Sequence, residues 1–212
     1  MTWLKLFLLA TCIGLATGFA SWVDLKVDCT EEIISIKNGF HTEYDDSGRL
    51  LADGNYKDGV KNARWCYYFL IDSTFNSPQE KLHYSREFLL KKEGFYKNGI
   101  KEYYWKCYYD QGRLEAEGWY SDGQKNKFWK FYNSDGELSQ EGHFRNGNKN
   151  GWWRAFEPVN KVMRKGQFKK GLKEGYWQRF ENDELISVAK YEKGKLLGRW
   201  TSYEEYLNWK KD

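Results

Sequence analysis

The chain reads GFYKNGIKEYYWKCYYDQGRLEAE over residues 94–117, GWYSDGQKNKFWKFYNSDGELSQE over 118–141, GHFRNGNKNGWWRAFEPVNKVMRK over 142–165 and GQFKKGLKEGYWQRF over 166–180. One pattern is thus stated four times, and both its leading glycine and its tryptophan return every 24 residues. A fixed period of this length is typical of a repeat architecture. The repeat therefore decides the fold.

Each repeat contains two predicted turns. A second glycine follows the leading one by five residues, in the triplets KNG, SDG, RNG and KKG. Asn-Gly and Asp-Gly pairs favour tight hairpin turns, because both turn residues need a positive φ. A later turn, in YDQGRL and NSDGEL, places Gly112 and Gly136 where a left-handed residue is needed. Each repeat is therefore predicted to form two short strands.

The strand that carries the leading glycine has two distinct faces. Leu114, Ala116, Gly118 and Tyr120 alternate with acidic residues and Trp119. This alternation predicts that one face of a sheet is covered and the other is mostly wet. A glycine in mid-strand normally weakens a strand. Its regular return indicates that it leaves room for an aromatic ring of the neighbouring strand, either the tryptophan or the Tyr/Phe three residues beyond it.

The repeat array is predicted to span residues 39–206 as an all-β fold of about 13 strands. The first repeat is degenerate, with His41 in the tryptophan position, and the last has Ala189 in the leading glycine position. Residues 207–212 form a tail, and TSYEEYLNWKKD (201–212) is expected to close the last hairpin or to cap the open edge. The signature residues of the array are Gly54, Trp65, Gly94, Trp105, Gly118, Trp129, Gly142, Trp153, Gly166, Trp177 and Trp200.

These units resemble the MORN-repeat variant of many bacterial proteins, in a family commonly labelled antitoxin-like. The resemblance rests on the pattern G-x-[YF]-x-[ND]-G-x-K-x-x-x-W-x-x-[YF]. It implies an elongated, single-layer antiparallel sheet of stacked β-hairpins without a central core. The label would imply a toxin as partner, but no motif residue carries that role.

The period breaks once, between Gly54 and Gly94, where an insertion occupies residues 70–87. Ser77-Pro78-Gln79-Glu80 fits the start of a helix with a capping box. Alternatively, Tyr84 and Phe88 keep the strand parity of the repeat, which predicts a lengthened hairpin. In either form the insertion is a candidate recognition element, with Tyr84 and Phe88 as candidate binding residues.

Residues 1–20 hold one charge, Lys5, followed by an apolar run that predicts a cleaved signal peptide. The apolar stretch within residues 4–23 could instead remain as an anchor helix. Lipidation at Cys12 is a third reading, with a poor match to the lipoprotein pattern. All three predict export to the periplasm, the outside or a membrane surface. Residues 21–38 lead from this segment into the array.

Charge and composition limit the partners. The chain has 34 Lys and Arg against 30 Asp and Glu, spread through every repeat, which predicts no nucleic-acid stripe. The Lys that follows each leading glycine by seven residues is expected on a solvated face, or alternatively in a row of cations that meets an anionic surface. Aromatic residues make up 19% of the chain, which suits rings stacked on a thin sheet. Trp119 and Trp152 are candidates for an exposed binding surface.

No catalytic site is predicted. Cys66 and Cys107 point to opposite faces of different repeats, so a disulfide between them is not expected. The three histidines lie in separate units, no CxxC or HExxH is present, and no Ser or Cys has a base partner. We therefore expect neither an enzyme nor a bound cofactor or metal. The leading hypothesis is a scaffold that binds another protein; the alternatives are association with a membrane surface and binding of cell-wall glycans.

Overall fold

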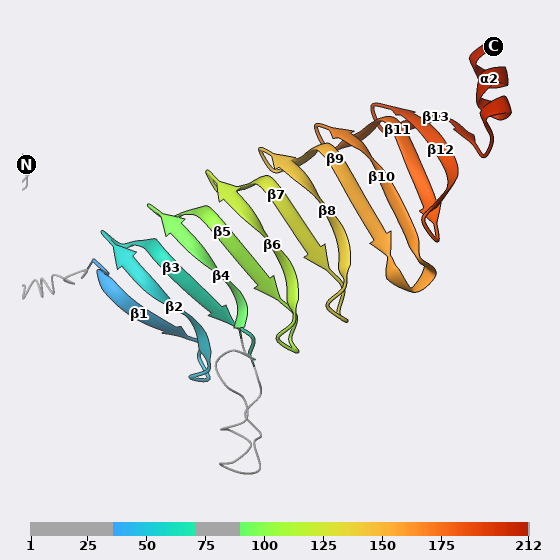
Figure 1. Ribbon diagram of the computed structural model, residues 1–212. Coiled ribbons are helices and arrows are strands. Elements are labelled where there is room, and N and C mark those ends of the chain that lie inside the picture. Colours follow the sequence, from blue (N-terminus) through green and yellow to red (C-terminus); the bar gives the residue numbers. More distant parts are fainter. Residues whose placement is uncertain (1–35, 71–89, 212) are drawn as a thin grey trace, which may run out of the picture. The chain divides into compact units, whose positions relative to one another are not determined.

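The computed structural model describes residues 36–70 and 90–211. In these ranges thirteen strands form one open antiparallel sheet, and each strand pairs with its neighbours in chain order (Figure 1). The prediction of an all-β repeat sheet is confirmed. The strands are β1 (Gly39–Tyr44), β2 (Leu50–Lys57), β3 (Val60–Tyr68), β4 (Leu90–Lys97), β5 (Ile100–Tyr108), β6 (Leu114–Ser121), β7 (Gln124–Tyr132), β8 (Leu138–Arg145), β9 (Asn148–Glu157), β10 (Val162–Lys169), β11 (Leu172–Glu181), β12 (Glu184–Glu192) and β13 (Lys195–Trp200).

The predicted signal or anchor segment, residues 1–20, lies outside the described residues, as do residues 71–87 of the insertion with Tyr84 and Phe88. A 3₁₀ turn, η1 (Pro158–Asn160), joins β9 to β10, and a helix, α2 (Tyr203–Lys211), follows β13. Among the described residues, no helix has the length and apolar character that a membrane span requires.

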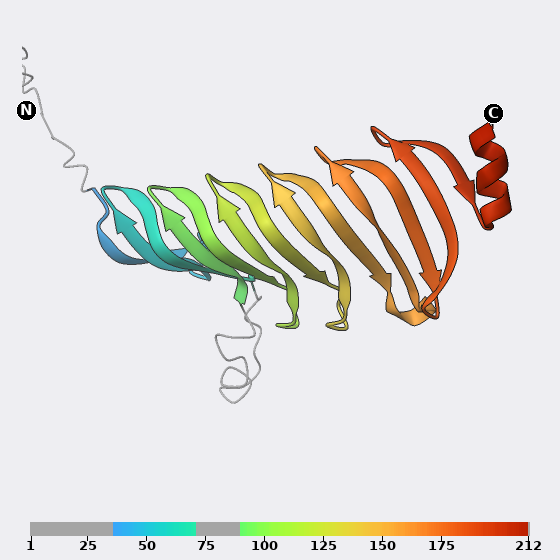
Figure 2. The ribbon, with the colours of Figure 1, turned by 45° about the horizontal axis from the view of Figure 1, so that its top comes forward.

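The tight hairpin turns follow the sequence prediction. Asn98-Gly99 and Asp122-Gly123 both have two residues with positive φ, as a two-residue hairpin turn requires. The turn glycine also bonds to the preceding repeat, because Gly123 N donates to the carbonyl of Lys101 at 3.0 Å and Gly147 N to that of Lys125 at 2.9 Å. These hairpin tips are thus each hydrogen-bonded to the hairpin before them. The hairpins follow one another along the sheet in Figure 2.

A bulge recurs in the second strand of each complete repeat. Between β6 and β7, Gly118 pairs with Trp129 while the next residue, Trp119, pairs with Asn126, so two residues of β7 have no partner there. Lys127, the first of these two, has φ +56°. The bulge twists the strand and places the tryptophan opposite the leading glycine.

The core is a single layer of indoles on one face, which we call the Trp face. Trp65, Trp105 and Trp129 are almost fully buried although the sheet has no second layer. Each indole lies over the leading glycine of the preceding strand, where a β-carbon would stand 2.2 to 2.5 Å from the ring atoms. The indole Nε1 donates to the carbonyl of the residue that follows this glycine. Trp129, for example, donates to the carbonyl of Trp119 at 2.9 Å. The expectation that the glycine makes room for a ring is confirmed for the tryptophan.

The indoles join an unbroken ladder of rings. Within a repeat, the aromatic residue two positions after the glycine meets the indole edge-on, as Tyr120 meets Trp129 with centroids 5.2 Å apart. Between repeats, Trp105 meets Tyr120 at 5.8 Å in the same geometry. Edge-to-face pairs at these distances stabilise beyond the area they bury. Every repeat is therefore stabilised mainly by its two neighbours, as repeat architectures require.

The repeated lysines do not form the solvated face that was expected. Lys61, Lys125 and Lys149 place their ammonium groups 3.8 to 4.4 Å from the centroid of the indole in their own repeat. Burial lowers the pKa of Lys101, Lys125 and Lys149, because the charged form loses water. The sequence prediction was wrong here, because a long amphipathic side chain can cover a ring with its stem and face it with its charge.

The last repeat departs from the pattern because of Ala189. The register pairs Ala189 with Arg199 and Val188 with Trp200, so the bulge has one extra residue and Trp200 points to the other face. In the other repeats a β-carbon on the leading glycine would overlap the indole, so an alanine at this position leaves no room for an indole. Trp200 is buried instead against α2, with centroids 4.7 Å from Trp209 and 5.3 Å from Tyr206. Tyr203, which holds the Tyr/Phe position of the repeat pattern, begins this helix.

Candidate functional site

The face opposite the Trp face, which we call the open face, carries exposed rings. They sit either one or ten residues after a leading glycine, and these two positions pair across neighbouring strands, as Tyr104 pairs with Trp119. Single exposed rings are ordinary, but a series on one face marks an interaction surface. We call this set the aromatic row: Phe95, Tyr104, Trp119, Phe128, Trp152 and Tyr176.

Both tryptophans proposed from the sequence lie in the aromatic row. Trp119 is 36% exposed and Trp152 is 59% exposed. The ring of Trp119 meets Tyr104 edge-on at 5.6 Å, and the ammonium group of Lys127 lies 4.4 Å from its centroid. Trp152 on β9 pairs across to Gln167 on β10. The structure brings Trp119 and Trp152 to the same face, three strands apart; it does not describe Tyr84 and Phe88.

A row of charges runs beside the aromatic row on the open face. It is formed by the residue before each leading glycine and the residue after each tryptophan, which pair across strands. Opposite charges directly across from each other stabilise a sheet by about 0.2 to 1 kcal/mol per pair, and like charges destabilise it. We call this set the charge row: Glu93, Lys106, Glu117, Lys130, Glu141, Arg154 and Lys165.

Tyrosines hydrogen-bond to two acids of the charge row. Each tyrosine lies two residues after the lysine that pairs with the acid. Tyr108 donates to Glu93 at 2.8 Å, and Tyr132 donates to Glu117 at 2.9 Å. Burial, and then the hydrogen bond to Glu117, raises the pKa of Tyr132 to about 12. The next repeat has Phe156 in place of this tyrosine. Arg154 lies over the Phe156 ring and forms an ion pair with Glu141.

A depression opens on the open face between β7 and β11. Its volume is about 430 Å³, and it is lined by Phe128, His143, Trp152, Glu141, Arg154 and Lys165, with Gly142 and Gln178. Phe128 meets His143 edge-on at 5.1 Å, so these two rings form one wall. Glu141 is only 5% exposed, whereas the Arg154 side chain is 57% exposed. The depression therefore combines exposed rings with exposed positive charge.

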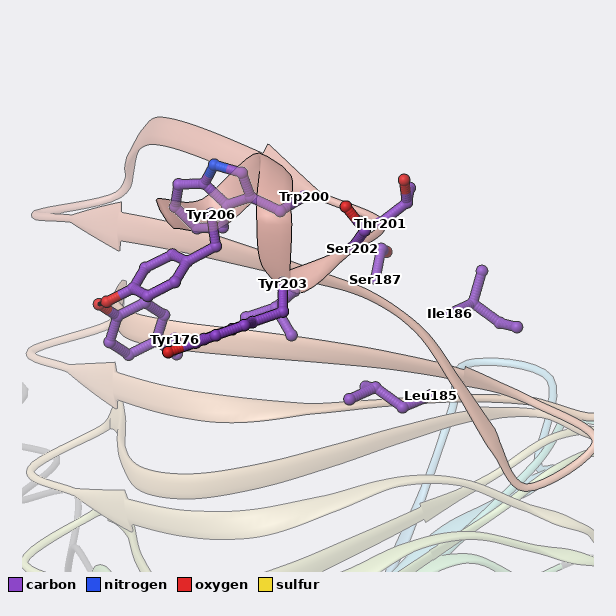
Figure 3. A pocket seen from close by; sticks show the side chains of 10 residues that line it. Tyr176, Leu185, Ile186, Ser187, Trp200, Thr201, Ser202, Tyr203 and Tyr206 are labelled. Atoms are coloured by element: carbon purple, nitrogen blue, oxygen red, sulfur yellow. Dashed lines mark hydrogen bonds between the residues drawn. The ribbon is translucent and has the colours of Figure 1, made fainter. Parts of the chain in front are cut away.

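A second cavity, of about 330 Å³, lies between α2 and strands β11 to β13 (Figure 3). Tyr176, Trp200, Tyr203 and Tyr206 contribute its rings, and the hydroxyls of Tyr176 and Tyr206 are 3.2 Å apart. Its walls are mostly apolar, and Tyr203, Ser187, Thr201 and Ser202 supply the remaining hydroxyls. It arises where α2 packs on the flipped Trp200, and we assign it to the packing of the helix.

The cysteines and histidines lie apart from the depression except for His143. The register places Cys66 opposite Glu93 on the open face and Cys107 opposite Ala116 on the Trp face, as predicted. Burial raises the pKa of both thiols, which makes them poor nucleophiles. Across residues 36–70 and 90–211, no three His, Cys, Asp or Glu side chains are grouped so as to hold a metal ion. The open face is suited to binding through rings and ion pairs.

A search against protein-family models returns no match for this chain, and a search of curated proteins returns none either. The function is therefore argued from the sheet itself.

Sequence reasoning found the two tryptophans but missed Arg154 and Lys165. A signal for them was present. The residue before the leading glycine is Glu93, Glu117 and Glu141 in three successive repeats and then Lys165, a change of sign that the repeat alignment shows. The charge row could not be recognised from spacing alone, because the bulge decides which residues face each other.

Proposed function

We propose that this protein is a non-catalytic, exported β-repeat scaffold that binds another protein on its open face. The observation that carries the proposal is the aromatic row, six exposed rings along one face of a sheet whose other face holds the buried indoles. Aromatic and arginine side chains supply most hot spots of protein interfaces. The charge row beside them would give such an interface its register and selectivity.

A one-layer sheet supports this function physically. Because the Trp face already satisfies the packing needs of each repeat, the rings of the aromatic row are not needed to bury the indoles. When exposed, these rings lower the solubility of the protein. When a partner covers them, their burial contributes favourable free energy to binding. Export and membership of the MORN-variant type are part of the proposal and rest on the sequence pattern. No residue of the repeat motif supports the antitoxin-like label.

The proposal is tested by site-specific photo-crosslinking in cells of the source organism. A photoreactive phenylalanine derivative replaces Trp119 or Trp152 on the open face, and Ala155, on the same strand as Trp152 but on the Trp face, serves as the matched control. We expect one protein to crosslink at positions 119 and 152 and not at 155. The proposal fails if no protein crosslinks on the open face, or if the same proteins crosslink equally at 155.

Two further arms separate the alternatives. The protein without residues 1–20 is sedimented with anionic liposomes at low salt and with insoluble cell-wall glycan. Binding to either material that Trp152→Ser abolishes, together with no crosslinked protein, would replace the proposal by membrane or glycan binding.

A further inference from the structure

The charge row alternates in sign along most of the sheet. Lys106 lies across from both Glu93 and Glu117, and Lys130 lies across from both Glu117 and Glu141. Each charge therefore has an opposite charge directly beside it on at least one side, and the three acids and two lysines leave this part of the open face without a net positive charge. A polyanion would find no continuous positive track on this face.

The alternation breaks at one place. Arg154 on β9 lies across from Glu141 on one side and from Lys165 on the other, so two cations stand directly opposite each other. On its far side Lys165 faces Gln178, which is neutral. Within the described ranges no acid forms an ion pair with Lys165, whose ammonium group lies 4.8 Å from the ring centroid of Phe180.

A sequence normally avoids this arrangement, because like charges across a strand pair destabilise the sheet. Where a protein breaks a rule that the rest of its sequence obeys, the position is a candidate for function. Here the break coincides with the depression and with Trp152, the most exposed member of the aromatic row. Three independent features, an unbalanced charge, a concavity and an exposed indole, therefore meet between β7 and β11.

We propose that this depression binds an acidic side chain of a peptide segment in the partner protein, next to an aromatic or large apolar residue. The inference rests on the proposed function and names the chemistry of its partner. Arg154 and Lys165 bind the carboxylate from its two sides, and Trp152 and Phe128 contact the apolar neighbour. Because Glu141 neutralises part of the charge of Arg154, the site holds about one anionic group and not a chain of them.

The test uses the protein with residues 1–20 intact and two capped five-residue peptides. One alternates glutamate with phenylalanine, and the other has glutamine in place of each glutamate. Binding is followed by the NMR shifts of the Trp152 indole N–H and the His143 ring. We expect saturable shifts of these signals with the acidic peptide, and binding at least about tenfold weaker with the glutamine peptide.

Two variants separate binding from folding. Lys165→Glu restores the alternation of the charge row, so we expect an unchanged or higher Tm together with a loss of acidic-peptide binding of about tenfold or more. Lys130→Gln removes a cation from the same row outside the depression and should leave binding unchanged. Inorganic phosphate is the third probe, and we expect no shift comparable to that of the peptide.

The inference is overturned if both peptides bind equally, if Lys165→Glu still binds the acidic peptide like the parent protein, or if phosphate alone reproduces the shifts. The two proposals are told apart by crosslinking in the Lys165→Glu variant. If one of these outcomes occurs and the partner protein still crosslinks at position 119, the inference fails while the proposed function stands. If no crosslink forms at 119 or 152 in the parent protein, the proposed function itself fails.

Discussion

The indole of Trp129 lies against the backbone of Gly118, so close that a β-carbon on the glycine would stand 2.3 Å from Cδ2 of the ring. The same relationship recurs in every complete repeat and replaces the second layer that a sheet normally needs. It also divides the two faces, because the indoles cover one and leave the other for the aromatic row.

Replacing Gly118 by alanine should therefore destabilise the fold. The new methyl group overlaps the indole, and the indole is held by its Nε1 bond to the carbonyl of Trp119. We expect the free energy of unfolding to fall by about 3 kcal/mol, the upper end for overpacking. Denaturant unfolding followed by tryptophan fluorescence measures it.

Gly136→Ala is the control for this substitution. Gly136 has φ +88°, and no atom lies within 4 Å of the place where the alanine methyl group would stand, so alanine there meets only backbone strain. A cost of about 1 kcal/mol is expected. Equal costs at the two glycines would show that the indole does not occupy the space over Gly118.

Trp200→Ala should release α2 from the sheet. Trp200 holds the helix through Trp209 and Tyr206, and loss of a buried Trp costs about 3 to 5 kcal/mol. We expect rapid hydrogen exchange of the amides of residues 203–211 and faster trypsin cleavage at Lys210. Trp177→Ala, on the Trp face, should destabilise the sheet by a similar amount without this local effect. Slow exchange in the helix of Trp200→Ala would contradict the flipped position of Trp200.

The Tyr132→Phe variant should lose less stability at high pH than the parent protein loses. Burial and the hydrogen bond to Glu117 raise the pKa of Tyr132 from 10.0 to about 12, so the folded state favours the neutral phenol. This contribution is complete below pH 10 and is lost as the pH rises through about 12. The variant should be less stable by about 1 kcal/mol at pH 8. The gap should narrow between pH 10 and 12, the range that the two pKa values bound.

Denaturant unfolding at a series of pH values measures this gap. Tyr103→Phe is the control, because the Tyr103 hydroxyl makes no hydrogen bond to any described residue and its ring is exposed. A constant gap between the parent protein and Tyr132→Phe up to pH 12, the raised pKa, would contradict the bond to Glu117.

The sequence predicted the features that repeat. Glycine and tryptophan spacing indicated the hairpins, and the position of Gly118 indicated a ring over the backbone. The spacing could not predict the bulge as a repeated feature, because in three repeats its left-handed residue is Ala63, Tyr103 or Lys127, none of which signals a positive φ. Only Gly151 and Gly175, at the same position of the next two repeats, carry such a signal. The bulge decides which residues pair, so the charge row and the two cations Arg154 and Lys165 were hidden with it.

The structure at the C-terminal end of the array could not be predicted for a different reason. Ala189 differs from glycine by one methyl group, and the sequence pattern treated it as a tolerated variant. A β-carbon at the leading position of the other repeats would overlap the indole. In the structure Ala189 accompanies a shorter bulge, and Trp200 lies on the other face. Residues 203–211 then form α2 against Trp200. From the sequence, this segment was expected to close the last hairpin or to cap the open edge, and a helix was not predicted.

The most direct test of the account is the chemical shift of the α-protons of the leading glycines. Protons beneath an indole ring are shifted strongly upfield by its ring current. In a ¹H–¹³C correlation spectrum we expect this shift for Gly54, Gly94, Gly118, Gly142 and Gly166 but not for the turn glycine Gly136, and we expect Trp129→Leu to abolish it for Gly118 alone. Leading-glycine protons at the same positions as those of Gly136 would contradict the account.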